Sequence, residues 1–107
     1  MMVATREQSE ATIVDVSGDV DMGTSPDLRK ALLESLKATS RLVVNLSAVR
    51  YVDSSGIASL VEVLKEARNK KKRLVLFGLT TGVREVLQLT RLTKIFEICE
   101  TEEQALA

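Results

Sequence analysis

Histidine is absent from this chain of 107 residues, and cysteine occurs once, as Cys99. The first absence excludes the Ser-His-Asp and Cys-His arrangements of nucleophilic catalysis and every zinc site that uses imidazole ligands. The second excludes an internal disulfide and a metal site built from a cysteine cluster. We expect Cys99 to be a small apolar filler near a strand end rather than a reactive thiol. The usual equipment of an enzyme is therefore missing.

Aromatic residues are also scarce, with one tyrosine and two phenylalanines. This scarcity disfavours a stacking platform for single-stranded nucleic acid. Lysine and arginine number 15, as do aspartate and glutamate, so no net charge attracts the chain to nucleic acid or to an anionic membrane. The basic run at residues 68–73 is better explained by cations that favour the C-terminal end of a helix. We predict no nucleic-acid partner.

No apolar run approaches the length of a membrane span, and the first residues lack the basic start and apolar stretch of a signal peptide. Hydrophobic residues make up 45% of the chain, which is typical of a folded globule. A chain of this length can build one core but not two. We therefore expect residues 1–107 to form a single cytoplasmic domain.

Short apolar runs alternate with apolar residues at helical spacing. Residues 41–46 and 74–77 are typical of central strands that are buried on both faces. Thr24 or Ser25 is expected to cap the first helix, with Pro26 at its first position. The whole pattern predicts strands at 3–6, 11–16, 41–46, 74–77 and 95–98, and helices that follow residue 24, the serines at 54 and 55, residue 80 and residue 101.

This order of elements predicts an α/β fold, because parallel strands that follow one another need a crossover helix between them. The first two strands are separated only by a polar turn at residues 8–10, which indicates a hairpin. We predict a mixed, largely parallel sheet of four or five strands that is flanked by helices.

The run Asp53-Ser54-Ser55-Gly56 stands where an apolar strand gives way to an amphipathic helix. A hydroxyl there lies over free backbone N–H groups and the positive end of a helix dipole. A phosphate suits this position, either as a ligand or as a covalent group on serine. The alternative is structural, since aspartate and serine cap helices and a glycine lets a helix pack close to a sheet. Residue chemistry alone leaves both explanations open.

Residues 78–82 offer a second glycine-containing turn between a strand and a helix. The turn lacks the Gly-Lys-Ser/Thr ending of a phosphate loop and has no lysine that could reach a phosphate. We predict an ordinary strand-to-helix turn.

Three stretches carry a family pattern. Residues 18–21 read Gly-Asp-Val-Asp, with Pro-Asp-Leu at 26–28; residues 43–56 end in Asp-Ser-Ser-Gly; and residues 84–96 contain Arg-Glu-Val-Leu and Leu-Thr-Lys-Ile-Phe. From Val14 to the C-terminus the chain resembles the STAS family, and most closely its stand-alone bacterial anti-sigma factor antagonists. Asn45 stands where that family commonly has aspartate.

The resemblance implies a STAS fold and a protein that switches between partners. The unphosphorylated form would bind an anti-sigma factor that is also a serine kinase with a GHKL-type ATP site, and would thereby free the sigma factor. That kinase would phosphorylate Ser54 and so abolish binding, and a PP2C-type phosphatase would reverse the step. No cofactor would belong to this chain, because ATP and metal belong to its partners. We expect a monomer or a weak homodimer.

The other residues of the motif are assigned to the switch loop. Ser55 would cap the second helix or act as a neighbour that shapes the loop, together with Gly56. Asp21 and Asp53 would shape the loop and the surface that faces the kinase. We expect a phosphate on Ser54 to leave the fold intact and to break the interface, where an unpaired dianion is costly.

Two alternatives to this function remain. STAS domains also act as accessory subunits of transporters, including a lipid-trafficking ABC system, and as scaffold subunits in stress signalling. The other alternative is an enzyme with Ser54 as nucleophile, for which Lys65 is the nearest candidate base in sequence. Lys65 lies about three turns into the helix and is expected to point away from its N-terminus, which disfavours this alternative.

Overall fold

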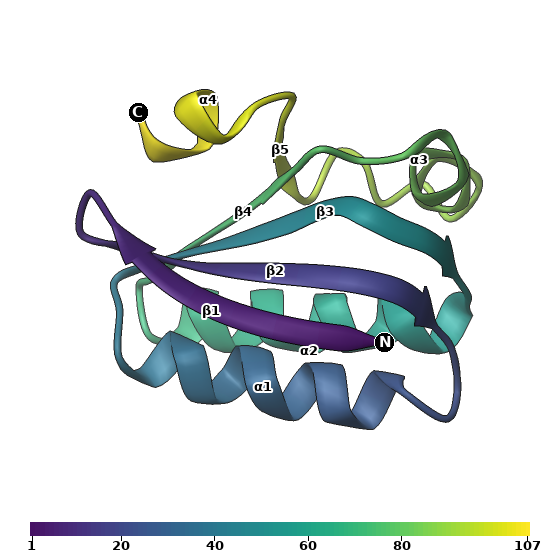
Figure 1. Cartoon of the computed structure of the whole chain (residues 1–107), viewed down its shortest axis with the longest axis horizontal. Helices are drawn as coiled ribbons and strands as arrows, with labels where there is room; N and C mark the ends of the chain where they lie inside the picture. Colours follow the sequence, from purple (N-terminus) through teal and green to yellow (C-terminus); the bar gives the residue numbers. More distant parts are fainter.

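The computed structural model describes residues 1–107. The elements are β1 (Met2–Gln8), β2 (Ala11–Val20), α1 (Ser25–Lys37), β3 (Arg41–Val52), α2 (Ser54–Asn69), β4 (Arg73–Phe77), α3 (Thr81–Leu89), β5 (Glu97–Cys99) and α4 (Glu102–Leu106). The strands form one sheet in the order β1-β2-β3-β4-β5 (Figure 1). β1 is antiparallel to β2, and the other neighbouring pairs are parallel. The predicted mixed, largely parallel sheet flanked by helices is confirmed.

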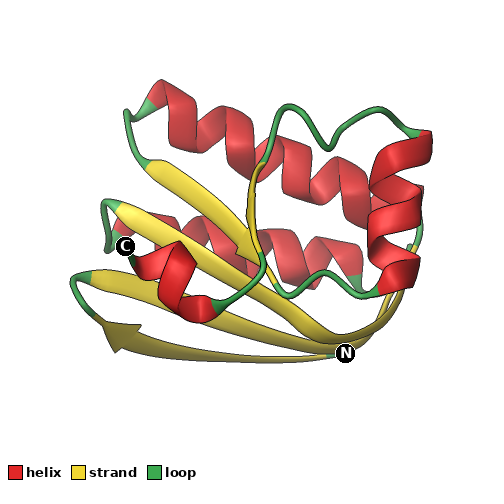
Figure 2. Ribbon diagram, turned by 90° about the horizontal axis from the view of Figure 1, so that it is seen from above, coloured by secondary structure: helices red, strands yellow, loops and turns green.

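The helices cover the two faces of the sheet unequally. α1 and α2 lie side by side against one face, whereas α4 lies over the opposite face (Figures 1 and 2). α3 packs beside the C-terminal end of β3 (Figure 1). A core cluster of 21 buried residues is centred between the sheet and the two long helices, and a cluster of six includes the one buried residue of α4.

The helical faces predicted from apolar spacing are buried. In α1 the buried apolar residues are Leu28, Leu32 and Leu36, which recur once per turn. The Ser59 hydroxyl of α2 donates a hydrogen bond of 3.2 Å to the Ser25 carbonyl of α1, so the two helices are tied together near their N-termini. No helix has both the length and the apolar character needed to cross a membrane.

β2 and β3 extend further than their sequence pattern predicts. They reach Val20 and Val52, whereas the apolar patterns end at residues 16 and 46. The two strands stay paired along this extension, but the register shifts twice. Each shift places an extra residue in β3 and breaks the alternation of buried and exposed side chains by which a strand is recognised in sequence.

The last strand is also displaced from its predicted position. β5 spans Glu97–Cys99 instead of residues 95–98, because the Ile95 N–H closes a turn by donating 3.2 Å to the Leu92 carbonyl. Cys99 is half-buried at the end of this strand and packs against the smaller core cluster, as expected for an apolar filler.

The basic run after α2 is used within the fold. The Lys72 ammonium donates a hydrogen bond of 2.5 Å to the Leu36 carbonyl at the C-terminal end of α1. The Arg68 guanidinium donates to the Ile95 carbonyl, and Arg73 forms an ion pair with Glu97. Lys72 therefore acts as the charge pattern predicts, since cations stabilise the C-terminal ends of helices, although the helix is α1 and not α2.

An arginine links the first strand to the last helix. Arg6 lies on β1 and forms ion pairs with Asp15 on β2, at 2.8 Å, and with Glu102 on α4. The Asn45 amide donates a further hydrogen bond of 2.9 Å to Asp15. The hydrogen bonds from Arg6 lower the pKa of both carboxyl groups, with Asn45 adding to the effect on Asp15.

Candidate functional site

The motif that contains Asp21 and the motif that contains Asp53 meet at one end of the sheet, where β2 and β3 finish. Val20 and Val52 pair at the carboxyl ends of β2 and β3. Asp53, the residue that follows β3, donates its N–H to the Val20 carbonyl at 3.1 Å. The loops that hold Asp21 and Asp53 therefore start side by side, at the carboxyl ends of the strands, where open α/β sheets place their binding sites.

Asp53 is the N-cap of α2. Its backbone is extended, with φ of −104° and ψ of −175°, and its side chain accepts from the N–H groups of Ser55 and Gly56. Both bonds go to Asp53 Oδ1, at 2.9 and 3.1 Å. Of the two roles expected for Ser55, that of cap is wrong, since Asp53 has the extended backbone and the free acceptor oxygens that capping requires.

The two serines differ in their hydrogen bonding. The Ser55 side chain is half-buried, and its hydroxyl donates a hydrogen bond of 2.5 Å to Asp53 Oδ1. Ser54 is the first residue of α2, its side chain is exposed, and its hydroxyl has no hydrogen-bond partner within the chain. Ser54 is thus the one serine of the pair whose hydroxyl is free to meet another molecule.

Several donors converge on the Asp53 carboxylate and lower its pKa. The Ser55 hydroxyl has the largest effect, and the backbone N–H groups of Gly56, Ser55 and Met22 add to it. Partial desolvation opposes the shift without reversing it. The two loops themselves are joined at their start by the backbone hydrogen bond from the Asp53 N–H to the Val20 carbonyl.

Gly56 is required by packing. It is buried under the ends of β2 and β3, where a Cβ would lie 2.6 Å from Val52 Cγ2 and 2.7 Å from Val20 Cγ1. Cβ atoms in folded proteins essentially never approach another heavy atom to less than 3.0 Å. Gly56 therefore brings the start of α2 against the sheet, which is the structural explanation that the sequence left open for it.

Asp21 orders the loop that precedes α1. Its Oδ1 accepts hydrogen bonds of 2.9 Å from the Gly23 N–H and 3.1 Å from the Thr24 N–H. Thr24 occupies the N-cap position, but its hydroxyl makes no cap bond to the helix and instead donates to the Asp19 carbonyl. Thr24 is therefore at the predicted N-cap position, but its expected side-chain cap bond is absent, because the Asp21 carboxylate binds the N–H groups that precede the helix. Pro26 is the second residue of α1 and not the first.

Two exposed apolar side chains lie next to these loops. Met22 follows Asp21 and is 78% exposed, and Tyr51 is two residues before Asp53 and is 53% exposed. Arg50, which forms an ion pair of 3.4 Å with Asp19, adds an exposed cation. The sequence motifs do not include Met22; the available signal was an apolar residue in an otherwise polar loop that belongs to no helical or strand pattern.

The turn at residues 78–82 is an ordinary helix start. Thr80 is the N-cap of α3 and accepts a hydrogen bond from the Val83 N–H, while its own hydroxyl donates 3.1 Å to the Val49 carbonyl. Gly78 has a φ of +72°, which explains the glycine without a ligand. The prediction of an ordinary turn is confirmed.

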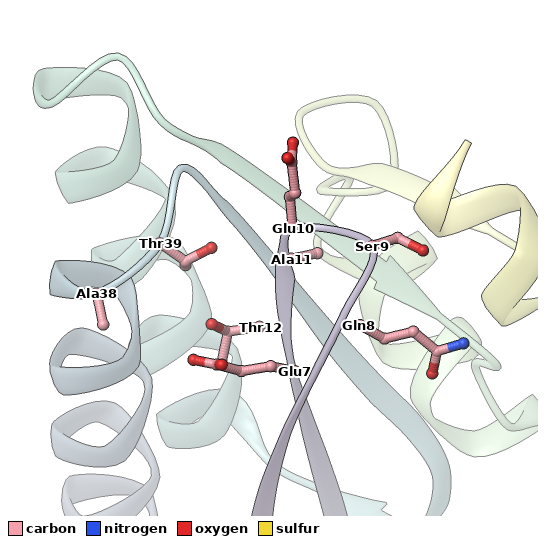
Figure 3. Close-up of a pocket in the computed structure, with 8 residues that line it drawn as sticks. All are labelled: Glu7, Gln8, Ser9, Glu10, Ala11, Thr12, Ala38 and Thr39. Carbon is pink, nitrogen blue, oxygen red and sulfur yellow. The ribbon is translucent and has the colours of Figure 1, made fainter.

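A hollow of about 340 Å³ lies at the opposite end of the sheet, between the β1–β2 turn and the C-terminal end of α1 (Figure 3). Its wall includes Glu7, Glu10, Thr12 and Thr39 and carries no cationic side chain. No group of three or more Cys, Asp or Glu residues in the chain is placed to hold a metal ion. The hollow therefore has no cation to attract an anion, and the loops around Asp53 remain the candidate site.

Comparison with known proteins gives similarity over almost the whole chain. The family model described as STAS domain matches residues 2–105. The anti-sigma-B factor antagonist of Listeria monocytogenes is 34% identical over 88 residues, which cover 81% of this chain and 77% of that protein. The anti-sigma-B factor antagonist of Staphylococcus aureus is 28% identical over 102 residues and 94% of each chain. The crystal structure of an anti-sigma factor antagonist from Mycobacterium paratuberculosis has a TM-score of 0.88 and 27% identity, and covers 98% of this chain and 90% of that one.

Proposed function

Because this chain belongs to the STAS domain family, we propose that it is an anti-sigma factor antagonist that works as a partner switch. In its unphosphorylated form it binds an anti-sigma factor and so frees a sigma factor. The anti-sigma factor is also a serine kinase, and it phosphorylates the antagonist on Ser54 to end the binding. A PP2C-type phosphatase removes the phosphate. The similarity to anti-sigma-B factor antagonists supports the antagonist role.

One observation carries the choice of Ser54. Its hydroxyl is exposed at the first position of α2 and has no partner within the chain, whereas the hydroxyl of Ser55 is bound to Asp53. A kinase substrate must present its hydroxyl to the base and to the phosphate of the kinase at once. Ser54 meets this requirement without any rearrangement of the loop.

The switching step is a phosphoryl transfer that uses the partner's ATP. The Ser54 oxygen forms a bond to the γ-phosphorus, the bond between that phosphorus and the bridging oxygen of ADP breaks, and the hydroxyl proton passes to a base of the kinase. Hydrolysis by the phosphatase returns the free hydroxyl and inorganic phosphate. The antagonist supplies the acceptor oxygen and the surface that surrounds it.

The phosphate acts at the interface because the loop can neutralise little of its charge. It brings about −1.5 to −2 charges to the start of α2, where an anion is normally stabilised. The N–H groups of Ser55 and Gly56, however, already donate to Asp53, and that carboxylate repels a second anion. A bound partner would have to bury this charge without a matching cation, which is costly.

The remaining residues of the site have supporting roles in this proposal. Asp21 and Asp53 hold the two loops in the shape that the partner contacts, and Gly56 keeps the start of α2 against the sheet. Ser55 strengthens the cap through its bond to Asp53. None of these residues takes part in the transfer of the phosphoryl group.

The direct test is phosphorylation by the candidate anti-sigma kinases of the source organism. We expect incubation with ATP to add one phosphate, mapped to Ser54 by mass spectrometry, and the Ser54→Ala variant to bind the kinase but to accept no phosphate. The Ser40→Ala variant, altered at an exposed serine in the α1–β3 connection, serves as the control. Binding without phosphate on Ser54 for every kinase would contradict the switch and favour a scaffold or transporter accessory role.

A further inference from the structure

We propose that the Asp53 carboxylate decides which of the two adjacent serines receives the phosphate, by holding the Ser55 hydroxyl and leaving Ser54 free. This inference rests on the proposed function, since it concerns the selectivity of the same phosphorylation. It makes Asp53 a positioning residue, which acts through Ser55 and does not touch the reacting atoms.

The sequence presents the kinase with two chemically equal acceptors. Ser54 and Ser55 are neighbours in the first turn of α2, so a kinase that reaches one of them lies close to the other. What separates them is their contacts. Asp53 Oδ1 accepts both the hydroxyl, at 2.5 Å, and the N–H, at 2.9 Å, of Ser55, and it makes neither bond with Ser54.

The bound hydroxyl is a poor acceptor for two reasons. Its proton points to Asp53, so Ser55 must break a charge-assisted hydrogen bond before it can give that proton to a kinase base. The Ser55 side chain is also half-buried, so its oxygen must turn outwards to lie in line with the γ-phosphorus. Asp53 cannot replace the kinase base, because the donors around it lower its pKa and weaken it as a proton acceptor.

Capping alone does not require a charged residue at this position. Asparagine is as good an N-cap as aspartate, since its side-chain oxygen accepts the same backbone N–H groups. It is, however, a neutral and weaker acceptor for a hydroxyl. The Asp53→Asn variant therefore retains the helix start and loosens the Ser55 hydroxyl, which separates selectivity from folding.

The experiment compares the wild type, Asp53→Asn and a charge-matched control, Glu85→Gln, which alters an exposed residue of α3. Each protein is phosphorylated by the partner kinase to the same total, below one phosphate per chain, and the two sites are quantified by tandem mass spectrometry. We expect the ratio of Ser55 to Ser54 phosphate to rise about tenfold in Asp53→Asn, the difference between a charged and a neutral acceptor, and to stay at the wild-type value in the control. An unchanged ratio in Asp53→Asn, with Ser54 still phosphorylated, would overturn the inference alone.

A second measurement needs no kinase. In proton NMR spectra at low temperature, the Ser55 hydroxyl proton of the wild type should exchange slowly enough with water to be observed. This hydroxyl signal should disappear in Asp53→Asn. In Ser55→Thr the threonine hydroxyl proton should give an equivalent signal, because the variant retains a hydroxyl donor at position 55. A Ser55 hydroxyl that exchanges as fast as that of Ser54 would overturn the inference even if Ser54 is phosphorylated. Wild-type protein that accepts no phosphate on either serine would overturn the proposed function and this inference together.

Discussion

Val20 and Val52 stand opposite each other where β2 and β3 end, and together they leave no room for a side chain on the residue of α2 that they touch. That residue is Gly56, whose missing Cβ would lie within 2.7 Å of both valines. The candidate site is thus built on a close contact between a helix and a sheet, and the position of Ser54, two residues earlier, depends on it.

This contact predicts the cost of a methyl group at the glycine. Gly56→Ala should lower the free energy of unfolding by about 1 kcal/mol, since overpacking costs about 1–3 kcal/mol and the helix propensity of alanine returns only about 1 kcal/mol. Urea denaturation measures the change. Gly82→Ala in α3 is the control, because a Cβ there meets only the Arg50 carbonyl at 3.8 Å and should be neutral or stabilising. A Gly56→Ala protein as stable as the wild type would show that the loops yield easily.

A charge at Ser54 should act on binding and not on folding. Ser54→Glu places a carboxylate at an exposed position beside Asp53, and we expect it to weaken binding to the anti-sigma factor by about 100-fold, as a buried unpaired charge does. Titration calorimetry measures the affinity, and amide NMR spectra should retain wild-type dispersion. Ser40→Glu, at the opposite end of β3, should bind normally. Collapse of the amide dispersion in Ser54→Glu would contradict the view that the charge works at the interface.

The sequence predicts the layers of this fold better than the details of its site. Leu28, Leu32 and Leu36 identify a buried face of α1 because the signal is a repeat within one element. The cap of α2 depends on a shift of two residues: Asp53 immediately precedes the helix, whereas Ser55 is its second residue. No periodicity resolves such a step, and the start of a helix is the least certain part of any sequence-based assignment.

The ends of β2 and β3 show a second limit. Their pairing continues to Val20 and Val52 through two register shifts. These shifts remove the alternation of buried and exposed side chains from which the extended strands could have been predicted. As a result, the meeting of the two loops follows from the sheet and not from either motif. The family resemblance brings Asp21 and Asp53 into one site, but the hydrogen bond between Asp53 and Val20 that joins the loops could not be predicted from the residues.

Met22 is predicted to contribute to partner binding without contributing to stability. Its side chain is 78% exposed in the loop that starts beside Asp53, so truncation removes no core contact. Met22→Ser should weaken binding to the anti-sigma factor by about tenfold, which corresponds to about 1.4 kcal/mol, and should leave the urea midpoint unchanged. Leu89→Ser is the matched control, since Leu89 is the last residue of α3 and is 84% exposed. Equal binding by both variants would place the interface away from this loop.

The ion pairs of Arg6 predict how stability falls in acid. Asp15 and Glu102 have pKa values below their ordinary ones in the folded chain because Arg6 donates to both. Groups with lowered pKa values bind fewer protons in the folded state than in the unfolded state. Their stabilisation is therefore complete above the unfolded values, near pH 4, and is lost as the pH falls through the folded values below that.

Arg6→Gln should remove this part of the pH dependence. We expect the free energy of unfolding to fall less steeply below about pH 4 than in the wild type, and to be lower by about 1 kcal/mol at pH 7, since solvent screens a partly exposed pair. Arg29→Gln, which removes an exposed arginine without an ion pair, should retain the wild-type slope. Amide exchange of Ala105, the buried residue of α4, should be faster in Arg6→Gln alone, because Glu102 then no longer ties this helix to the sheet. Equal slopes and equal exchange in the two variants would mean that α4 is held by its apolar contacts, and that Arg6 adds nothing measurable to the link between β1 and the C-terminal helix.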